Sequence, residues 1–70
     1  MKRSALIRKI SKRAKAVGTT WELTRQGTNH EQWRCGDSIV YVPRHPQVND
    51  LTAQGICRDL EEELGKGWWR

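Results

Sequence analysis

One histidine in this sequence stands where a side chain could move a proton beside a phosphate. His30 directly follows the short polar turn Gly27-Thr28-Asn29. An imidazole ring can exchange a proton near neutral pH, and the backbone N–H groups of a glycine-containing turn can point toward a phosphate. A histidine beside a hairpin turn can also be only an exposed polar residue. His30 is therefore the candidate catalytic residue, with a surface histidine as the alternative.

RNA is a substrate that would need little more than such a group, because it carries its own nucleophile. Cleavage without a metal requires a base for the 2′-hydroxyl, an acid for the leaving oxygen and cations that stabilise the phosphorane. His45 is the nearest rival of His30, but its Pro-Arg-His-Pro setting favours a rigid loop that sets the shape of the chain. Arg44 is a candidate phosphate contact, with an exposed salt bridge as the alternative.

Charge is distributed unevenly along the chain, which has a formal net charge of +5. The first 17 residues carry seven cations and no acid, whereas residues 50–63 carry five acids against one arginine. A basic pole favours a polyanionic partner, and an acidic pole favours a solvated face or a protein contact. We expect RNA to contact Lys9, Lys12 and Arg13, although a solvated face would also explain these cations. The other expected RNA contacts are Gly27, Thr28, Asn29, Arg34 and Arg44.

Helical spacing of apolar residues predicts a first helix near the N-terminus. It runs from Ser4, as the N-cap, to Val17, and Gly18 provides the stop. Its apolar residues share an arc of roughly 100° that faces the core. They are Leu6, Ile7, Ile10, Ala14 and Val17. The remaining side carries basic residues that form a ridge toward solvent, namely Arg8, Lys9, Lys12, Arg13 and Lys15.

Alternation of apolar and polar residues predicts three strands after this helix. They cover residues 21–25, 30–35 and 38–42, and Pro43 ends the third by removing a backbone donor. One face of the sheet is expected to pack on the core through Trp21, Leu23, Trp33, Val40 and Val42. The opposite face is expected to hold Glu22, Gln32, Arg34, Ile39 and Tyr41, with His30 at the start of its strand. This second face is open and polar enough to meet a ligand.

A second helix is predicted from near Thr52 to Gly65, which ends it. Its apolar face consists of Ala53, Ile56, Cys57, Leu60 and Leu64. Gly55 is unfavourable inside a helix and would mark a place of close packing. The order α-β-β-β-α predicts an α+β fold, a two-layer sandwich with both helices on one face of a three-stranded antiparallel sheet. At 70 residues the chain forms a single domain, residues 1–70.

Several other classes of site are not favoured. Cys35 and Cys57 match no zinc or redox spacing, and we expect free thiols in a reducing cytoplasm. Asp59 and the glutamates 61–63 lie mainly off the apolar arc of the second helix, where a solvated face explains them better than a metal cluster. We therefore expect no metal and no cofactor. The longest apolar stretch, residues 39–43, is strand-sized, so no membrane contact is expected.

Two short motifs together resemble a known family. Gly27-Thr28-Asn29-His30 and Val42-Pro43-Arg44-His45-Pro46 are similar, at this spacing and in this order of elements, to motifs of HicA-type mRNA interferase toxins of type II toxin–antitoxin systems. The resemblance covers Ser4 to Gly65. It implies a fold like that of double-stranded-RNA-binding domains and a metal-independent endoribonuclease with His30 as the catalytic residue. It also implies inhibition of translation and a cognate HicB-type antitoxin that covers the active face.

Two segments depart from the pattern of this family. Gln54-Gly55-Ile56 stands where many relatives have a Gly-Thr-Leu-like opening of the last helix, so the start of that helix is open. The sequence also has Trp68-Trp69-Arg70 at its end, which either packs on the domain or serves a partner.

Three functions of other classes stay open. A non-catalytic double-stranded-RNA-binding-like module would use the same fold and charge, and it would leave RNA intact. A DNA-binding regulator is less favoured, because neither helix has the features of a recognition helix in a helix-turn-helix. A metal nuclease is least favoured, because the sequence offers no convincing cluster of ligands.

Overall fold

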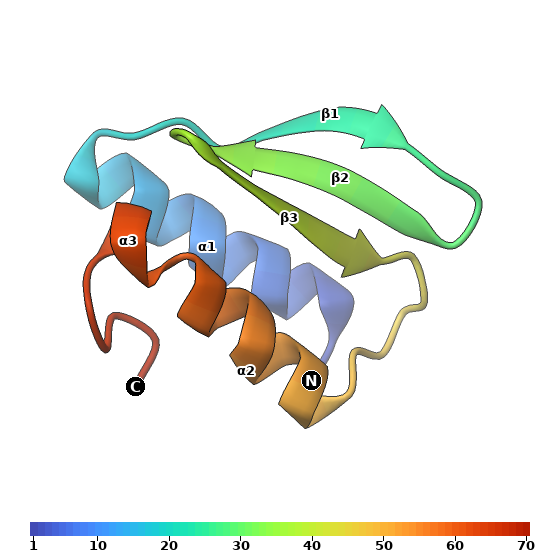
Figure 1. Cartoon of the computed structure of the whole chain (residues 1–70). Coiled ribbons are helices and arrows are strands. Elements are labelled where there is room, and N and C mark those ends of the chain that lie inside the picture. The colour runs from blue at the N-terminus through green and yellow to red at the C-terminus, as the bar shows by residue number, and fades with distance from the viewer.

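Three helices cover one face of a three-stranded antiparallel sheet in the computed structural model, which describes residues 1–70 (Figure 1). The elements are α1 (Arg3–Val17), β1 (Glu22–Gln26), β2 (His30–Cys35), β3 (Ser38–Pro43), α2 (Asp50–Asp59) and α3 (Glu61–Leu64). The strands lie in the order β1-β2-β3, so β1 and β3 are the edges of the sheet. The α+β fold, its α-β-β-β-α order and its two layers are confirmed.

One hydrophobic cluster forms between the sheet and the helices, and it contains 12 buried residues. They are Leu6, Ile10, Ala14, Cys35, Val40, Val42, Val48, Ala53, Ile56, Cys57, Leu60 and Leu64. The helical members recur at the spacing of one helix face, and Val40 and Val42 alternate along β3 on the side that faces the helices. Replacing a fully buried member such as Ile10 by alanine would cost about 2–5 kcal/mol.

The apolar face of the sheet is covered less completely than alternation predicts. Trp21 and Trp33 stack with ring centroids 4.5 Å apart and pack, partly buried, against the core. Leu23 pairs with Trp33 but is 38% exposed, so its prediction as a core residue is wrong. The reason is its place on β1, an edge strand whose five residues are all exposed and which lies farthest from the helices in Figure 1.

A charged residue occupies the core-facing row of β2 instead. Glu31 is 8% exposed and forms an ion pair with Arg3 in the first turn of α1. Glu31 Oε1 also accepts a hydrogen bond from Trp33 Nε1 at 3.2 Å. Arg3 Nε donates to the carbonyl of Pro43 at 2.9 Å, and Pro43 pairs with His30 across the two strands. Arg3 therefore connects α1 to the start of β2, where His30 lies, and to the end of β3.

Helix α1 starts one residue before the predicted N-cap. Lys2 precedes the helix and no side chain caps it, so the prediction of Ser4 as the N-cap is wrong. Instead, the backbone N–H of Arg3 donates to Pro46 O at 2.8 Å, and Lys2 forms an isolated β-bridge with Gln47. The loop after β3 thus satisfies a backbone donor that a capping side chain would otherwise bind.

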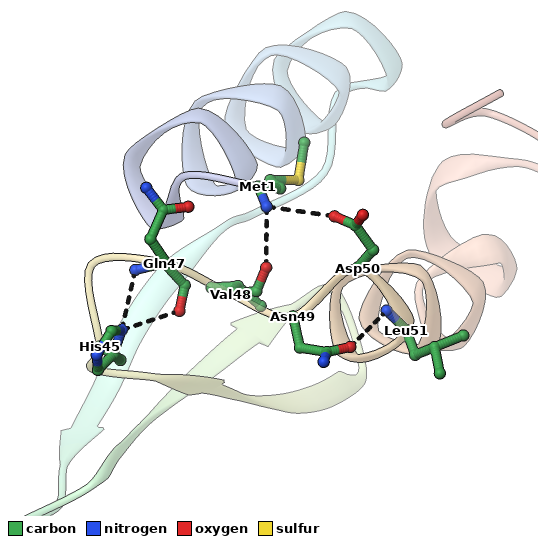
Figure 2. Close-up of polar contacts among 7 residues, drawn as sticks. All are labelled: Met1, His45, Gln47, Val48, Asn49, Asp50 and Leu51. Carbon is green, nitrogen blue, oxygen red and sulfur yellow. Dashed lines mark hydrogen bonds and ion pairs between the residues drawn. The ribbon is translucent and has the colours of Figure 1, made fainter.

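The second predicted helix is divided and begins two residues early. Asn49 caps α2, because its side-chain oxygen accepts the backbone N–H of Leu51 at 2.8 Å (Figure 2). This cap moves the start from Thr52 to Asp50. The helix is interrupted at Leu60, after which α3 runs to Leu64, directly before the predicted stop at residue 65.

Gly55 of α2 has open space around it, whereas Cys35 of β2 and Cys57 of α2 are buried. Apart from the adjacent backbone of its own helix, no atom lies within 4 Å of the position that a Cβ on Gly55 would take, so the expected close packing is wrong. Cys35 and Cys57 are buried free thiols. Burial raises the pKa of both, and the negative charge of Glu63 adds to the increase at Cys35. Both thiols are therefore poor nucleophiles.

The segment after α3, called the tail below, packs on the helices. Trp68 Nε1 donates to the carbonyl of Cys57 at 3.0 Å. Glu61 Oε2 accepts the backbone N–H of Gly67 at 2.8 Å and the indole N–H of Trp69 at 3.0 Å. Of the two roles considered for the C-terminal tryptophans, packing on the domain is the one that the structure describes.

Candidate functional site

The turn between β1 and β2 is held from two sides. The backbone N–H of Gly27 donates to His30 O at 2.8 Å and closes the turn. Arg44, just after β3, donates its backbone N–H to Asn29 O and its Nη1 to Gly27 O, both at 2.9 Å. A Cβ on Gly27 would lie 2.9 Å from the backbone oxygen of His30, so this turn needs glycine. The segment before His30 therefore has a fixed shape.

His30 opens β2 on the face of the sheet that points away from the helices, and it is exposed. It borders an open hollow of about 390 Å³ at the end of the sheet. Seven residues line this hollow: Arg25, Gly27, Thr28, Asn29, His30, Gln32 and Tyr41. The structure thus brings His30 together with the three turn residues that the sequence singled out. No hydrogen bond engages the backbone N–H groups of Thr28 and Asn29, so both are available to a ligand.

Three residues of the hollow come from the strands. Gln32 and Tyr41 were predicted on this face by alternation, but without a role. Arg25 was missed, because strict alternation places it with Leu23 on the core-facing side. A β-bulge lies between Leu23 and Arg25, and it brings Arg25 opposite Gln32. An inserted residue reverses the side of every residue that follows it, and no hydrophobic pattern in β1 signals it.

Arg34 and Arg44, which were expected to bind RNA, lie outside the lining of the hollow. Arg34 is on the same face of β2, but its Nε donates to Gly36 O at 3.0 Å, next to the β2–β3 turn. Arg44 does not line the hollow itself, but its Nη1 binds the carbonyl of Gly27, which does. Its observed partners are backbone carbonyls, so the alternative of an exposed salt bridge is wrong.

The basic ridge of α1 lies in the helical layer, on the other side of the sheet from the hollow (Figure 1). Two of its cations bind the C-terminal region: Lys9 Nζ donates to Trp69 O at 2.8 Å, and Arg13 Nε donates to Leu64 O at 2.9 Å. Lys12 is exposed and makes no such contact. The structure therefore does not bring the ridge and His30 into one site.

His45 is turned toward its own loop (Figure 2). Its Nδ1 lies 3.1 Å from both the backbone N–H nitrogen and the carbonyl oxygen of Gln47. A neutral ring can accept from the N–H, and a protonated Nδ1 can donate to the carbonyl. His45 does not line the hollow. These contacts agree with a loop that sets the shape of the chain rather than with a proton donor beside His30.

The chemistry available in the hollow is that of an imidazole, a guanidinium and neutral polar groups. No lining residue is a carboxylate, and Arg25 is the single arginine or lysine among them. No three His, Cys, Asp or Glu side chains anywhere in the protein gather closely enough to hold a metal ion. None of the helices has the length and apolar character needed to span a membrane.

Comparisons of this chain with protein family models, with curated proteins and with solved structures give no significant match.

Proposed function

We propose that this protein is an endoribonuclease that cleaves mRNA without a metal and uses His30 to transfer a proton. One observation carries the proposal: His30, the turn before it and Arg25 border the same open hollow, which contains no carboxylate. An anionic phosphodiester can enter such a hollow without repulsion. The resemblance of the two motifs to those of HicA-type toxins supports the same function.

The reaction would use the 2′-hydroxyl of the RNA as its nucleophile. The 2′-oxygen forms a bond to phosphorus while the bond from phosphorus to the 5′-oxygen of the next nucleotide breaks. His30 removes the proton from the 2′-oxygen or supplies one to the leaving oxygen. Arg25 and the free N–H groups of Thr28 and Asn29 stabilise the additional negative charge of the phosphorane. The products are a 2′,3′-cyclic phosphate and a 5′-hydroxyl.

The biological role that follows is that of a toxin in the cytoplasm, which inhibits translation by cutting mRNA. A HicB-type antitoxin would cover the hollow, and acidic residues on its surface would complement Arg25 and the turn N–H groups. Co-expression with this antitoxin should restore growth and protect mRNA. A complex that leaves the hollow open to RNA while it blocks toxicity would contradict this arrangement.

His30→Ala is the test of the proposed activity, with His45→Ala as the matched control. We expect His30→Ala to reduce the cleavage rate by about a hundred- to ten-thousandfold, the usual effect of losing a general acid or base. His30 is exposed, so its replacement should change stability by less than about 0.5 kcal/mol. His45→Ala should retain cleavage, and wild-type cleavage should persist in excess EDTA.

Two results would contradict the proposal. Intact RNA after incubation with folded wild-type protein would favour the non-catalytic RNA-binding module. Normal cleavage by His30→Ala together with loss of cleavage in folded His45→Ala would assign the proton transfer to the other histidine.

A further inference from the structure

The face of the sheet that points away from the helices carries one aromatic ring, and this ring has no aromatic partner. Tyr41 is 59% exposed in the middle of β3 and borders the hollow beside His30. The one aromatic stack in the protein, between Trp21 and Trp33, lies on the opposite face. No hydrogen bond holds the tyrosine hydroxyl. The flat side of this ring is therefore available to a planar group.

Tyr41 belongs to a row of three side chains that crosses the sheet. Gln32 of β2 pairs with Tyr41 on one side and, because of the β-bulge, with Arg25 on the other. Gln32 lines the hollow, and its Nε2 donates to Thr24 Oγ1 at 3.3 Å, whereas its Oε1 accepts no hydrogen bond. The row thus offers a cation, a hydrogen-bond acceptor and an aromatic plane, in that order.

From this row we infer that the hollow takes one unpaired nucleotide of single-stranded RNA, with its base stacked on Tyr41. Arg25 would face a phosphate, and Gln32 Oε1 would accept a hydrogen bond from an exocyclic amine on the edge of the base. This inference rests on the proposed function for the identity of the ligand. It adds that the substrate is single-stranded and that Tyr41 and Gln32 select it.

An RNA duplex fits these observations less well. Paired bases expose their edges but not their flat sides, and proteins that bind duplex RNA contact phosphates and 2′-hydroxyls across two successive minor grooves. Such binding needs a long charged surface. Here the ridge of α1 lies in the other layer, and two of its cations, Lys9 and Arg13, are bound to carbonyls near the C-terminus. The hollow offers a site for one splayed base.

Charge and lining also favour RNA over a protein segment as the occupant. One of the seven lining residues is a hydrophobic or aromatic side chain, Tyr41 itself, and none is acidic. An apolar peptide would find little apolar area there. A base and its phosphate match both the aromatic ring and Arg25.

The inference can be tested by binding measurements that do not require cleavage. We would measure the affinity of a fluorescent single-stranded oligoribonucleotide and of the corresponding duplex, with His30→Ala as the parent protein so that the RNA stays intact. Three further substitutions are added to this parent: Tyr41→Ala, Tyr41→Phe and Ile39→Ala. Ile39 is the matched control, because it is 45% exposed on the same face of the same strand but does not line the hollow.

We expect Tyr41→Ala to weaken single-strand binding by about 5- to 150-fold, the contribution of one stacked base. Tyr41→Phe should bind as the parent does, because it keeps the ring, and Ile39→Ala should have no effect. The duplex should bind more weakly and should not respond to Tyr41→Ala. Unchanged single-strand affinity in folded Tyr41→Ala, or equally tight binding of the duplex, would overturn the inference.

Of two further outcomes, the first would contradict only this inference and the second would contradict only the proposed function. An equal loss of affinity in Ile39→Ala would indicate a broad apolar contact surface and would also overturn the stacked base. A wild-type protein that leaves RNA intact but binds single strands through Tyr41 would refute the proposed activity and support the nucleotide site.

Discussion

Arg44 shows how a single side chain can control a site that it does not line. Its guanidinium and its backbone N–H both bind carbonyls of the β1–β2 turn at 2.9 Å. The position of His30 follows from that turn, because Gly27 donates to the carbonyl of His30. The role expected from sequence, a phosphate contact, is thus replaced by a positioning role in our proposal.

We predict that Arg44→Ala lowers the cleavage rate by about ten- to a hundredfold, as expected when a catalytic group is displaced. RNA affinity should change much less. Arg58→Ala is the control, because Arg58 is exposed on α2 and forms no hydrogen bond with the turn. Rates and affinities measured side by side distinguish the two roles. A large loss of affinity with an unchanged rate at saturating RNA would instead identify Arg44 as a phosphate contact.

Local sequence predicted the parts of the site that depend on neighbours in the chain. His30 and the three residues before it form one turn, so their proximity follows from the sequence itself. Arg25 could not be found in this way, because its side depends on the β-bulge that shifts the register of β1. The burial of Glu31 could not be predicted either, since it depends on an ion pair with Arg3, which is distant in the chain.

At the scale of the elements, the helices were predicted better than their ends. Apolar spacing defines a helix face, and every buried residue of α1 and α2 belongs to the predicted faces. Their starts depend on caps: a contact with Pro46 replaces a side-chain cap at α1, and Asn49 caps α2. The edge position of β1, which exposes Leu23, follows from strand order rather than from alternation.

Gly55 offers a test of helix α2 alone. Outside the adjacent backbone of α2, nothing lies within 4 Å of the position of an added Cβ, and alanine is favoured over glycine inside a helix by about 1 kcal/mol. We predict that Gly55→Ala raises the free energy of unfolding by up to about 1 kcal/mol, measured by urea denaturation. Gly27→Ala is the contrasting variant, because its Cβ would meet the backbone of His30. A destabilised Gly55→Ala would mean that α2 packs more closely than described.

The attachment of the tail should depend on pH through Glu61. Hydrogen bonds from the Gly67 backbone N–H and from the Trp69 indole, with nearby Arg70 and Lys66, lower the pKa of this carboxyl. A lowered pKa in the folded state means that the ionised form stabilises the docked tail. That stabilisation is present above about pH 4.3, the usual pKa of glutamate, and is lost as the pH falls through the lower value of the folded protein.

Tryptophan fluorescence should therefore report release of the tail on acidification. Glu61→Ala should show the released signal already at neutral pH. Glu62→Ala is the control, because Glu62 is exposed in the same short helix and binds no group of the tail. Identical acid titrations of Glu61→Ala and the wild type would show that another group holds the tail.

At the scale of the whole molecule, the two basic regions lie on opposite sides of the sheet. The hollow with Arg25 lies on one face of the sheet, and the ridge of α1 lies in the helical layer beneath the other face (Figure 1). A short RNA that occupies the hollow should therefore release counterions at Arg25 but not along α1. The electrostatic part of binding depends on the number of phosphates neutralised.

We predict that Arg25→Gln reduces the slope of log affinity against log salt by about 0.7 for a short single strand, the value for one lost phosphate contact. Lys12→Gln should leave this slope unchanged, although Lys12 was expected from sequence to bind RNA. Both side chains are exposed, so folding should survive either change. A smaller slope in Lys12→Gln would show that RNA passes around the sheet and reaches α1.

The stack of Trp21 on Trp33 gives the protein an optical property of its own. Two indole rings with centroids 4.5 Å apart and planes inclined by 13° are close enough for their electronic transitions to couple. Trp21 directly precedes β1 and Trp33 belongs to β2, so this coupling exists only while the two strands are joined. Circular dichroism can therefore follow the formation of the β1–β2 hairpin during refolding, separately from the docking of the helices. The same signal would give the rate at which the turn before His30 forms.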